Sequence, residues 1–193
     1  MTNTKKMTEN QETFIFDFDS TFIKVEALDV LCEVIYQDSA AGEQILKEIQ
    51  RLTDLGMEGK LSLKESLTKR IQLLQANRDH IGTVIEELKK KVTASVIRNR
   101  AFFKQHSENI YIISNGFKEI IIPIVSEYGI KPEHVLANTF KFDHDGKIIG
   151  FDEKDELCEN QGKVKKIKSL NLKGEAIMIG DGYTDYETLE GGA

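Results

Sequence analysis

Two aspartates follow the first apolar run of this 193-residue chain. The segment 14–16 is wholly apolar, and Asp17 and Asp19 come directly after it, one residue apart. Such a run is typical of a buried strand. Carboxylates beside a buried strand are unfavourable unless they are paired, hydrogen-bonded or bound to a metal. Asp17 and Asp19 are therefore candidates for chemistry at the carboxyl end of a strand.

Two further β-type runs, 110–113 and 176–179, also end in polar or glycine-rich residues. Together with 13–16 they are typical of parallel strands in an α/β fold. Open parallel sheets bind ligands beyond the carboxyl ends of their strands. We therefore expect the polar groups that follow all three strands to converge on one site.

The second and third strand ends supply different groups. The second is followed by Ser114, Asn115 and Gly116, and a helix expected from Phe117 would direct free N–H groups at an anion. The third is followed by the loop 180–185, GDGYTD. Its glycines permit a close approach of the backbone to a ligand.

The expected site is rich in aspartate and has no His or Cys nearby. Its carboxylates come from Asp17, Asp19, Asp181 and Asp185. Magnesium prefers a few carboxylates together with the phosphate oxygens of a substrate. The sequence therefore favours a bound Mg²⁺ and a phosphate.

The elements that must position these residues fall into two parts. Between the first two strands, apolar residues recur at helical spacing among Lys and Glu, and Ser62 and Glu65 form a capping-box pattern. The segment 140–151 alternates around an Asp-Gly turn, which predicts a β-hairpin. We predict a Rossmann-like parallel-sheet core with a β-hairpin, formed by 1–24 and 98–193, and an inserted helical cap domain at 25–97.

Composition excludes several classes of protein. The chain is 40% hydrophobic and 30% charged with a net charge of -6, and its basic residues are dispersed, so nucleic acid and anionic membranes are not expected partners. The polar first dozen residues lack the apolar core of a signal peptide or anchor. Cys32 and Cys158 lie far apart, which fits a reducing cytoplasm. We expect a cytoplasmic protein with a small-molecule substrate; the oligomeric state stays open.

The motifs resemble those of the haloacid dehalogenase superfamily of phosphatases, and among these the phosphoserine phosphatase family. The segments 17–21, 114–116 and 180–185 resemble its first, second and fourth motifs, and the helical insertion resembles its cap. Within the insertion, 57–61 and 66–70 are similar to the cap helices of that family. The order and spacing of these motifs together are more specific than any one of them.

The resemblance implies a magnesium-dependent phosphomonoester hydrolase. Asp17 would attack phosphorus to give an aspartyl-phosphate, because a carboxylate is ionised at neutral pH. Asp19 would be the general acid and base, which requires a raised pKa. Mg²⁺ would be held by Asp17, the backbone carbonyl of Asp19 and Asp181, with Asp185 orienting this shell.

The substrate implied by the resemblance is O-phosphoserine. Ser114 and the Asn115 N–H would bind phosphoryl oxygens, while Glu26 and Arg70 would bind the ammonium and carboxylate groups. The expected substrate-binding residues are Glu26, Met57, Arg70, Asn115, Gly116 and Thr184.

Two features depart from the family pattern. At the third motif, Gln161 stands where the family commonly has lysine, and Lys163 follows two residues later. Lys163 is our candidate for the catalytic lysine, and it can serve only if the helix starts later or the loop shifts. The chain also stops at Ala193, where the family core usually continues. An unpaired sheet edge is expected there, and either a fragment or a covering partner segment is compatible with it.

Three alternatives stay open at this level. The protein could be a phosphatase or phosphotransferase for another small phosphometabolite. It could be a catalytically silent binding module on the same fold, which Gln161 and the early end of the chain motivate. It could also fold only together with a partner.

Overall fold

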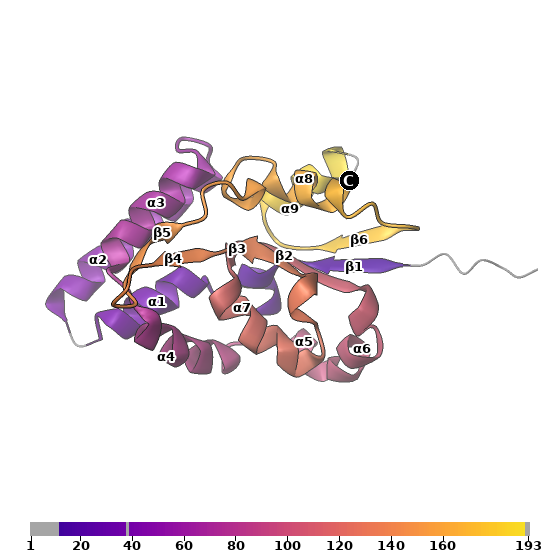
Figure 1. Cartoon of the computed structure of the whole chain (residues 1–193), viewed down its shortest axis with the longest axis horizontal. Coiled ribbons are helices and arrows are strands. Elements are labelled where there is room, and N and C mark those ends of the chain that lie inside the picture. Colours follow the sequence, from indigo (N-terminus) through magenta and orange to yellow (C-terminus); the bar gives the residue numbers. More distant parts are fainter. Residues whose placement is uncertain (1–11, 38, 192–193) are drawn as a thin grey trace, which may run out of the picture.

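A four-stranded parallel sheet forms the centre of the fold (Figure 1). This computed structural model describes residues 12–37 and 39–191, so the expected polar tail lies outside the described residues except for Glu12. The strand order is β3-β2-β1-β6, and every neighbouring pair is parallel. The strands are β1 (Thr13–Phe16), β2 (Ile110–Phe117), β3 (Val135–Asn138) and β6 (Ala176–Ile179). The predicted Rossmann-like parallel core is thus confirmed.

Helices cover both faces of this sheet. In Figure 1, α5 (Ala94–Arg98), α6 (Arg100–Gln105) and α7 (Lys118–Val125) lie below the sheet. Helices α8 (Gly162–Ser169) and α9 (Tyr183–Glu190) lie above it. The strands are therefore buried on both sides, which explains their nearly continuous apolar sequences.

Successive side chains of β1 point to opposite faces of the sheet. Phe14 and Phe16 pack against α6, with ring centroids 5.2 Å from Phe102 and 5.0 Å from Phe103, respectively. Ile15 points to the opposite face, because successive side chains of a strand alternate. There it joins a buried cluster with Ile113, Leu157 and Ile167.

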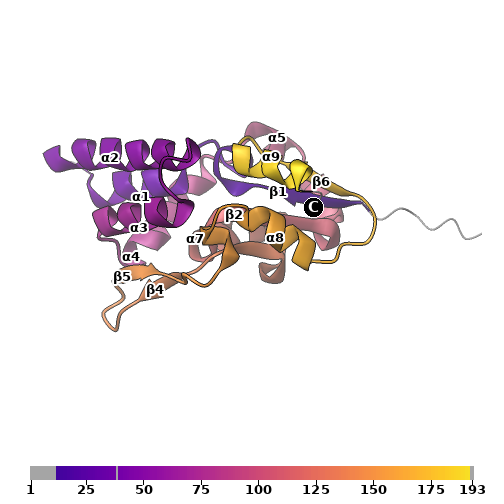
Figure 2. The same ribbon diagram turned by 90° about the horizontal axis from the view of Figure 1, so that it is seen from above.

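The helical insertion is formed by the first four of the six α-helices that the described chain has between β1 and β2. They are α1 (Ala27–Ile35), α2 (Ala40–Met57), α3 (Leu63–Leu74) and α4 (Arg78–Lys89). Figures 1 and 2 show them together beyond the carboxyl ends of the strands. The predicted capping box is confirmed at the start of α3: the Ser62 hydroxyl accepts from the Glu65 N–H, and the Glu65 carboxylate accepts from the Ser62 N–H.

The predicted β-hairpin is present and packs beside the helical insertion (Figure 2). Its strands, β4 (Phe140–Phe142) and β5 (Ile148–Phe151), are antiparallel. The Ile148 N–H donates to the Ala76 carbonyl at 2.8 Å, and the Arg78 N–H donates to the Gly146 carbonyl at 3.0 Å. In the sequence the hairpin lies between the core strands β3 and β6, but in space it packs against the region of α3 and α4.

Short helical turns complete the described chain. They are η1 (Phe18–Phe22), η2 (Ser107–Asn109), η3 (Ser126–Tyr128), η4 (Pro132–His134) and η5 (Glu156–Cys158).

Two boundaries near the second motif differ from the sequence expectation. Strand β2 continues to Phe117 instead of ending at Ile113, and α7 starts at Lys118 instead of Phe117. The pairing of β2 with β3 shifts register between Ile113 and Phe117. Residues 114–116 therefore form an irregular strand end rather than a free loop.

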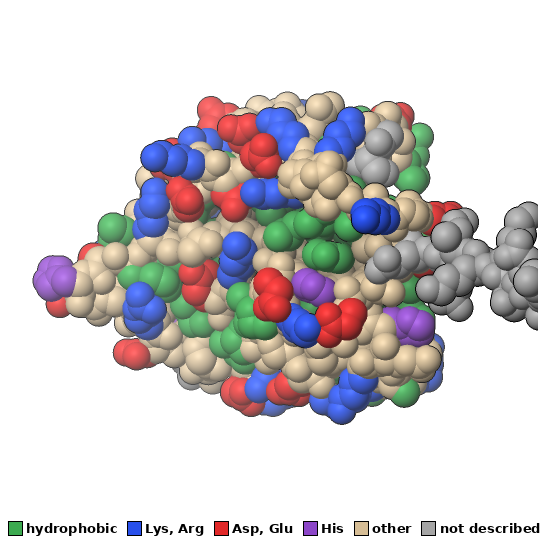
Figure 3. All heavy atoms as spheres, turned by 45° about the vertical axis from the view of Figure 1, so that its right-hand side comes forward, with side chains coloured by type: hydrophobic (Ala, Val, Ile, Leu, Met, Phe, Trp, Pro, Cys, Tyr) green, Lys and Arg blue, Asp and Glu red, His purple; other side chains and the backbone are tan. Residues whose placement is uncertain are grey.

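The surface carries mixed charge. On the face shown in Figure 3, acidic and basic side chains are interspersed and do not form an area of one sign. Within the described residues, no helix has both the length and the apolar composition that crossing a bilayer requires. Strand β6 pairs with β1 on one side and forms an edge of the described sheet.

Candidate active site

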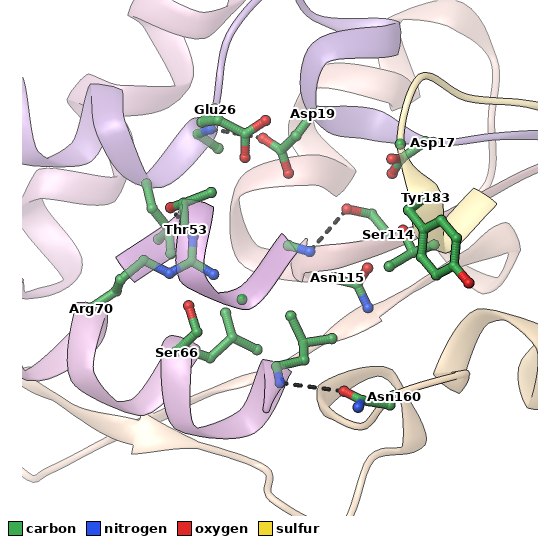
Figure 4. Close-up of a pocket in the computed structure, with 18 of the residues that line it drawn as sticks. Asp17, Asp19, Glu26, Thr53, Ser66, Arg70, Ser114, Asn115, Asn160 and Tyr183 are labelled. Atoms are coloured by element: carbon green, nitrogen blue, oxygen red, sulfur yellow. Dashed lines mark hydrogen bonds between the residues drawn. The ribbon is translucent and has the colours of Figure 1, made fainter. Parts of the chain in front are cut away.

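A cavity of about 520 Å³ lies between the strand ends and the helical insertion (Figure 4). All three predicted strand ends contribute to its wall. The core residues that line it include Asp17, Asp19, Ser114, Asn115, Gly116, Asp181 and Thr184. The lining residues from the start and body of the helical insertion include Glu26, Thr53, Ser66, Leu67 and Arg70.

Asp17 is buried at the end of β1. Its Oδ1 accepts a hydrogen bond of 2.7 Å from the Phe18 N–H, and its Oδ2 lies 2.8 Å from the Lys163 Nζ. Burial raises the pKa of Asp17 to about 6, with Asp185 adding to the rise and Lys163 opposing it. Asp17 is thus a carboxylate held in one orientation beside a cation.

The local conformation at residues 161–162 decides where Lys163 points. Gln161 has φ +58° and caps α8, which begins at Gly162. A Cβ at position 162 would collide with the backbone carbonyl of Glu156, so the close approach of these two segments requires glycine. Lys163 consequently lies in the first turn of α8, which turns its side chain inward.

Lys163 lies next to Asp17, as expected if it replaces the lysine of the third motif. Its Nζ lies 2.8 Å from Asp17 Oδ2 and 2.7 Å from Asp185 Oδ1, and its side chain is 2% exposed. Burial lowers the pKa of Lys163, but the two carboxylates outweigh this effect and leave it above the usual value. Lys163 is therefore a charged ammonium between two buried acids.

Three carboxylates form a candidate metal site. Oxygen atoms of Asp17, Asp181 and Asp185 all lie within 4.8 Å of one another. Asp181 is exposed and accepts a hydrogen bond from the Thr21 hydroxyl, whereas Asp185 is buried and accepts one from the Gly182 N–H. All the donors are hard oxygen atoms, which fits a divalent cation such as Mg²⁺. The Asp19 side chain is not part of this cluster; only its backbone carbonyl was expected to bind metal.

The Asp19 side chain lies beside the second strand end. Its Oδ1 accepts a hydrogen bond of 2.7 Å from the Ala27 N–H at the start of α1. Burial raises the pKa of Asp19 well above its usual value, and the negative charges of Glu26 and Asp17 raise it further. A raised pKa favours the protonated form of Asp19, which is the form that a general acid needs.

Gly116 brings Asp19 and Ser114 together. A Cβ at position 116 would lie 3.0 Å from Asp19 Oδ2 and 3.1 Å from Ser114 Oγ, so a side chain there would crowd both groups. The Gly116 N–H donates to the Ser114 hydroxyl oxygen at 2.9 Å. The expected phosphate-binding segment therefore faces the expected general acid.

Asn115 and Asn138 hold the irregular end of β2. The Asn115 side-chain amide donates to the Leu157 carbonyl at 2.7 Å, and the Asn138 amide donates to the Asn115 carbonyl at 2.8 Å. The bond to Leu157 fixes the Asn115 side-chain amide, and the sequence interpretation assigned the ligand contact to the Asn115 backbone N–H.

Glu26 and Arg70 place opposite charges in the same cavity (Figure 4). Glu26 Oε1 accepts a hydrogen bond of 2.9 Å from the Ser20 hydroxyl. Arg70 is 7% exposed, and its Nη1 donates to Thr53 Oγ1 at 3.1 Å. Burial lowers the pKa of Arg70, and its Nε has no hydrogen-bond partner within the described part of the chain.

Two further substrate-binding residues were expected, and the structure describes the side chain of one of them. Thr184 lines the cavity, whereas the Met57 side chain lies outside what is described. Sequence reasoning missed Thr53 and Asn160, which also line the cavity. Asn160 Oδ1 accepts from the Leu63 N–H at 3.4 Å and so links the core to α3. No sequence signal marked either residue, because each depends on a contact between distant segments.

Comparison with known proteins agrees with this geometry. The family model described as haloacid dehalogenase-like hydrolase matches residues 14–190. Human phosphoserine phosphatase is 32% identical over 186 residues, which cover 95% of this chain and 79% of the relative. The phosphoserine phosphatase of Methanocaldococcus jannaschii is 28% identical, with coverage of 93% and 81%.

Solved structures show the same fold. A phosphoserine phosphohydrolase-like protein from Francisella tularensis has a TM-score of 0.80 and 33% identity, covering 94% of this chain and 83% of its own. A substrate-bound phosphoserine phosphatase complex has a TM-score of 0.73 over 95% and 83% of the two chains, and at 22% identity it supports the fold alone. The chain belongs to the haloacid dehalogenase-like hydrolase family, and within it resembles the phosphoserine phosphatases.

Proposed function

We propose that this phosphoric monoester hydrolase converts O-phosphoserine to serine and phosphate through an aspartyl-phosphate on Asp17, with Mg²⁺ bound. One observation carries the proposal. A single cavity joins the acidic strand ends of the core to the oppositely charged Glu26 and Arg70. Phosphate chemistry and recognition of an amino acid can therefore occur side by side.

The substrate assignment follows from charge complementarity. Phosphoserine carries an ammonium and a carboxylate in addition to its phosphate. Glu26 would bind the ammonium, and Arg70, buried and with no bonded carboxylate within the described residues, would bind the carboxylate. A phosphate ester that lacks these two groups would lose both contacts.

The first chemical step uses Asp17 and Asp19. An Asp17 carboxylate oxygen forms a bond to phosphorus while the bond from phosphorus to the seryl oxygen breaks. Asp19 gives its proton to the departing seryl oxygen. In the second step Asp19 takes a proton from water, whose oxygen attacks phosphorus and releases phosphate and the free Asp17 carboxylate.

The remaining core groups stabilise charge on the transferring phosphoryl group. Lys163, held by Asp17 and Asp185, places a positive charge next to the nucleophile. The Ser114 hydroxyl and the Asn115 N–H would donate hydrogen bonds to phosphoryl oxygens, and Gly116 and Thr184 would lie against the same group.

The metal site would be formed by Asp17, Asp181 and the Asp19 backbone carbonyl, with Asp185 orienting the shell. When bound, Mg²⁺ supplies positive charge that reduces repulsion between the anionic nucleophile and the anionic phosphate. A bound cation would also reduce the repulsion among the three carboxylates, whose oxygens lie within 4.8 Å of one another. In the described chain, Lys163 is the one cation bonded to any of them.

We further propose that residues 25–97 act as a cap domain on the core formed by 1–24 and 98–193. The cavity lies between these two parts, so a cap that closes would exclude water from the first transfer. Met57 would belong to the substrate-facing side of this cap. A cytoplasmic location is part of the same proposal.

A panel of phosphate esters tests the substrate. With Mg²⁺, we expect the purified protein to hydrolyse O-phosphoserine with a higher kcat/KM than sugar phosphates, and Asp17→Asn to abolish turnover. Preference for a sugar phosphate would instead identify another phosphometabolite as substrate. Equal background rates for the parent and Asp17→Asn would indicate a silent binding module.

Thermal unfolding tests the metal site without relying on activity. Because bound Mg²⁺ stabilises the folded state, we expect Mg²⁺ to raise the Tm of the parent in a concentration-dependent manner. The rise should be much smaller in Asp181→Asn, which retains the exposed side chain but loses the charge. An equal Mg²⁺-dependent rise in both proteins would place the ion elsewhere.

A further inference from the structure

Thr53 lies on the wall of the cavity, at the end of α2 that faces α3. Its side chain is half-buried and points toward Arg70 (Figure 4). It comes from a different helix than Arg70, which lies near the middle of α3. The contact between the two side chains therefore depends on the packing of α2 against α3.

The hydrogen bonds of Thr53 fix the direction of its hydroxyl. Thr53 Oγ1 donates its one proton to the Ile49 carbonyl at 3.1 Å, one helical turn earlier. The lone pairs of the oxygen are then directed away from the helix backbone, and Arg70 Nη1 donates to them at 3.1 Å. Thr53 is thus an oriented acceptor for the guanidinium.

A neutral acceptor orients Arg70 without neutralising it. Among the described residues, no carboxylate forms an ion pair with Arg70, and its buried Nε has no hydrogen-bond partner. The positive charge is therefore not neutralised by a bonded carboxylate, and Thr53 uses only one of the five guanidinium N–H groups. An aspartate at position 53 would hold the guanidinium equally well but would compete with an anionic ligand.

We propose that Thr53 is a positioning residue for substrate selectivity: it holds the Arg70 guanidinium in the orientation that binds the substrate carboxylate. This inference rests on the proposed function, because it assumes that Arg70 binds the carboxylate of O-phosphoserine. Thr53 does not itself touch the reacting atoms.

Two substrates separate this role from a general structural one. O-phosphoethanolamine is O-phosphoserine without the carboxylate. We expect Thr53→Val to raise the KM for O-phosphoserine about tenfold, since a hydrogen bond to a charged group is lost, with kcat changed little. For O-phosphoethanolamine, kcat/KM should stay the same. Thr53→Ser, which keeps the hydroxyl, should restore the parent KM.

Thr68 provides a matched control. It is half-buried on α3, and its hydroxyl donates to the Lys64 carbonyl at 2.8 Å, as Thr53 does to Ile49. It does not line the cavity. Thr68→Val should therefore reproduce any general effect of losing such a hydroxyl, and the selectivity between the two substrates should remain that of the parent.

The outcomes distinguish this inference from the proposed function. If the parent prefers O-phosphoserine and Thr53→Val keeps that preference, the positioning role is wrong while the proposed function stands. If Thr53→Val weakens turnover of both substrates equally, the role is structural and the inference is overturned. If the parent itself does not discriminate between the substrates, the carboxylate contact and this inference fail together. Should Thr53→Val not fold, Thr53→Ala, which adds no methyl group, applies the same comparison.

Discussion

At the residue scale, the most constrained group is Lys163. It lies between Asp17 and Asp185 with both contacts under 3 Å, and all three side chains are buried. A buried charge that loses its partner is strongly destabilising, because the remaining charge is left without compensation. Lys163 therefore supports both the fold and the proposed reaction.

This arrangement predicts two separable effects of Lys163→Met. Removing the ammonium leaves the two carboxylates facing each other, so the free energy of unfolding should fall by about 3–5 kcal/mol. In Lys163→Met/Asp185→Asn one of these charges is also removed, and much of that loss should be recovered. Urea unfolding without Mg²⁺ measures both values.

Catalysis should not recover with stability. The double variant still lacks a positive charge beside the phosphoryl group, so kcat should remain about 10²-fold or more below that of the parent. A double variant no more stable than Lys163→Met would show that the two carboxylates do not repel each other as the structure implies.

The structure brings most of the predicted residues together, but their conformations were not predictable from the sequence. Asp17, Ser114 and Asp181 were recognisable because each follows an apolar strand, and the structure places them around one cavity. The direction of the Lys163 side chain could not be decided from the sequence. It depends on the left-handed conformation of Gln161 and on the close contact at Gly162. Gln161 carries no sequence mark of a positive φ.

At the element scale, Glu119 connects α7 to the hairpin. Its Oε1 accepts a hydrogen bond of 3.1 Å from the Phe140 N–H at the start of β4, and its Oε2 is buried with no hydrogen-bond partner within the described residues. Burial raises the pKa of Glu119, although the backbone hydrogen bonds oppose the rise. The ionised form is therefore unfavourable in the folded state.

The sign of the resulting pH dependence follows from linkage. The folded state binds a proton at Glu119 more tightly than the unfolded state, so this group adds stability as the pH falls through its raised folded pKa. Glu119→Gln removes the charge and keeps the acceptor for Phe140. We expect its free energy of unfolding to exceed that of the parent at pH 7.5, with the difference shrinking toward pH 5.

Glu119→Ala separates the charge from the hydrogen bond. It leaves the Phe140 N–H without its acceptor, so it should be less stable than the parent at both pH values by about 1–3 kcal/mol. A parent more stable than Glu119→Gln throughout the range would mean that the ionised carboxylate is favourable in this position.

The elements themselves were predictable where local signals were strong. The apolar runs at β1 and β6, the capping box before α3 and the Asp-Gly hairpin are all present at their expected positions. The end of β2 was not predictable, because Asn138 and η5 hold residues 114–116 in an extended conformation from outside the segment. The packing of the hairpin against the helical insertion is likewise a long-range contact.

At the scale of the whole molecule, the helical insertion is held to the core by an exposed ion pair. Lys64 Nζ at the start of α3 lies 2.8 Å from Glu153 Oε2, which follows the hairpin. The nearby hydrogen bond from the Leu63 N–H to Asn160 supports the same junction. Both contacts lie where the proposed cap meets the core.

Reversing one charge should loosen this junction slightly. Exposed pairs contribute about 0.2–1 kcal/mol, so Glu153→Lys should raise the KM for O-phosphoserine about two- to fivefold at low salt. The exchange Lys64→Glu/Glu153→Lys should restore it, and 0.5 M salt should weaken the difference. Steady-state kinetics at two ionic strengths measure both effects.

The control is Glu43→Lys, which changes the net charge equally but breaks only a surface pair with Lys47 within α2. Its KM should match that of the parent. A similar rise in KM for Glu43→Lys would assign the effect to overall charge rather than to the junction.

The strand order also has a consequence for synthesis of the protein. β1 is the first strand of the described chain, yet its two neighbours, β2 and β6, come from the middle and the far end. Contacts between such distant segments form slowly, whereas α1–α4 connect neighbours in sequence. During synthesis, Asp17 therefore cannot meet Asp181 and Asp185 until the chain has been made and released beyond residue 185. We therefore expect the helices α1–α4 to fold early in synthesis. The protein should gain its activity only later, when the last carboxylates of the site join Asp17.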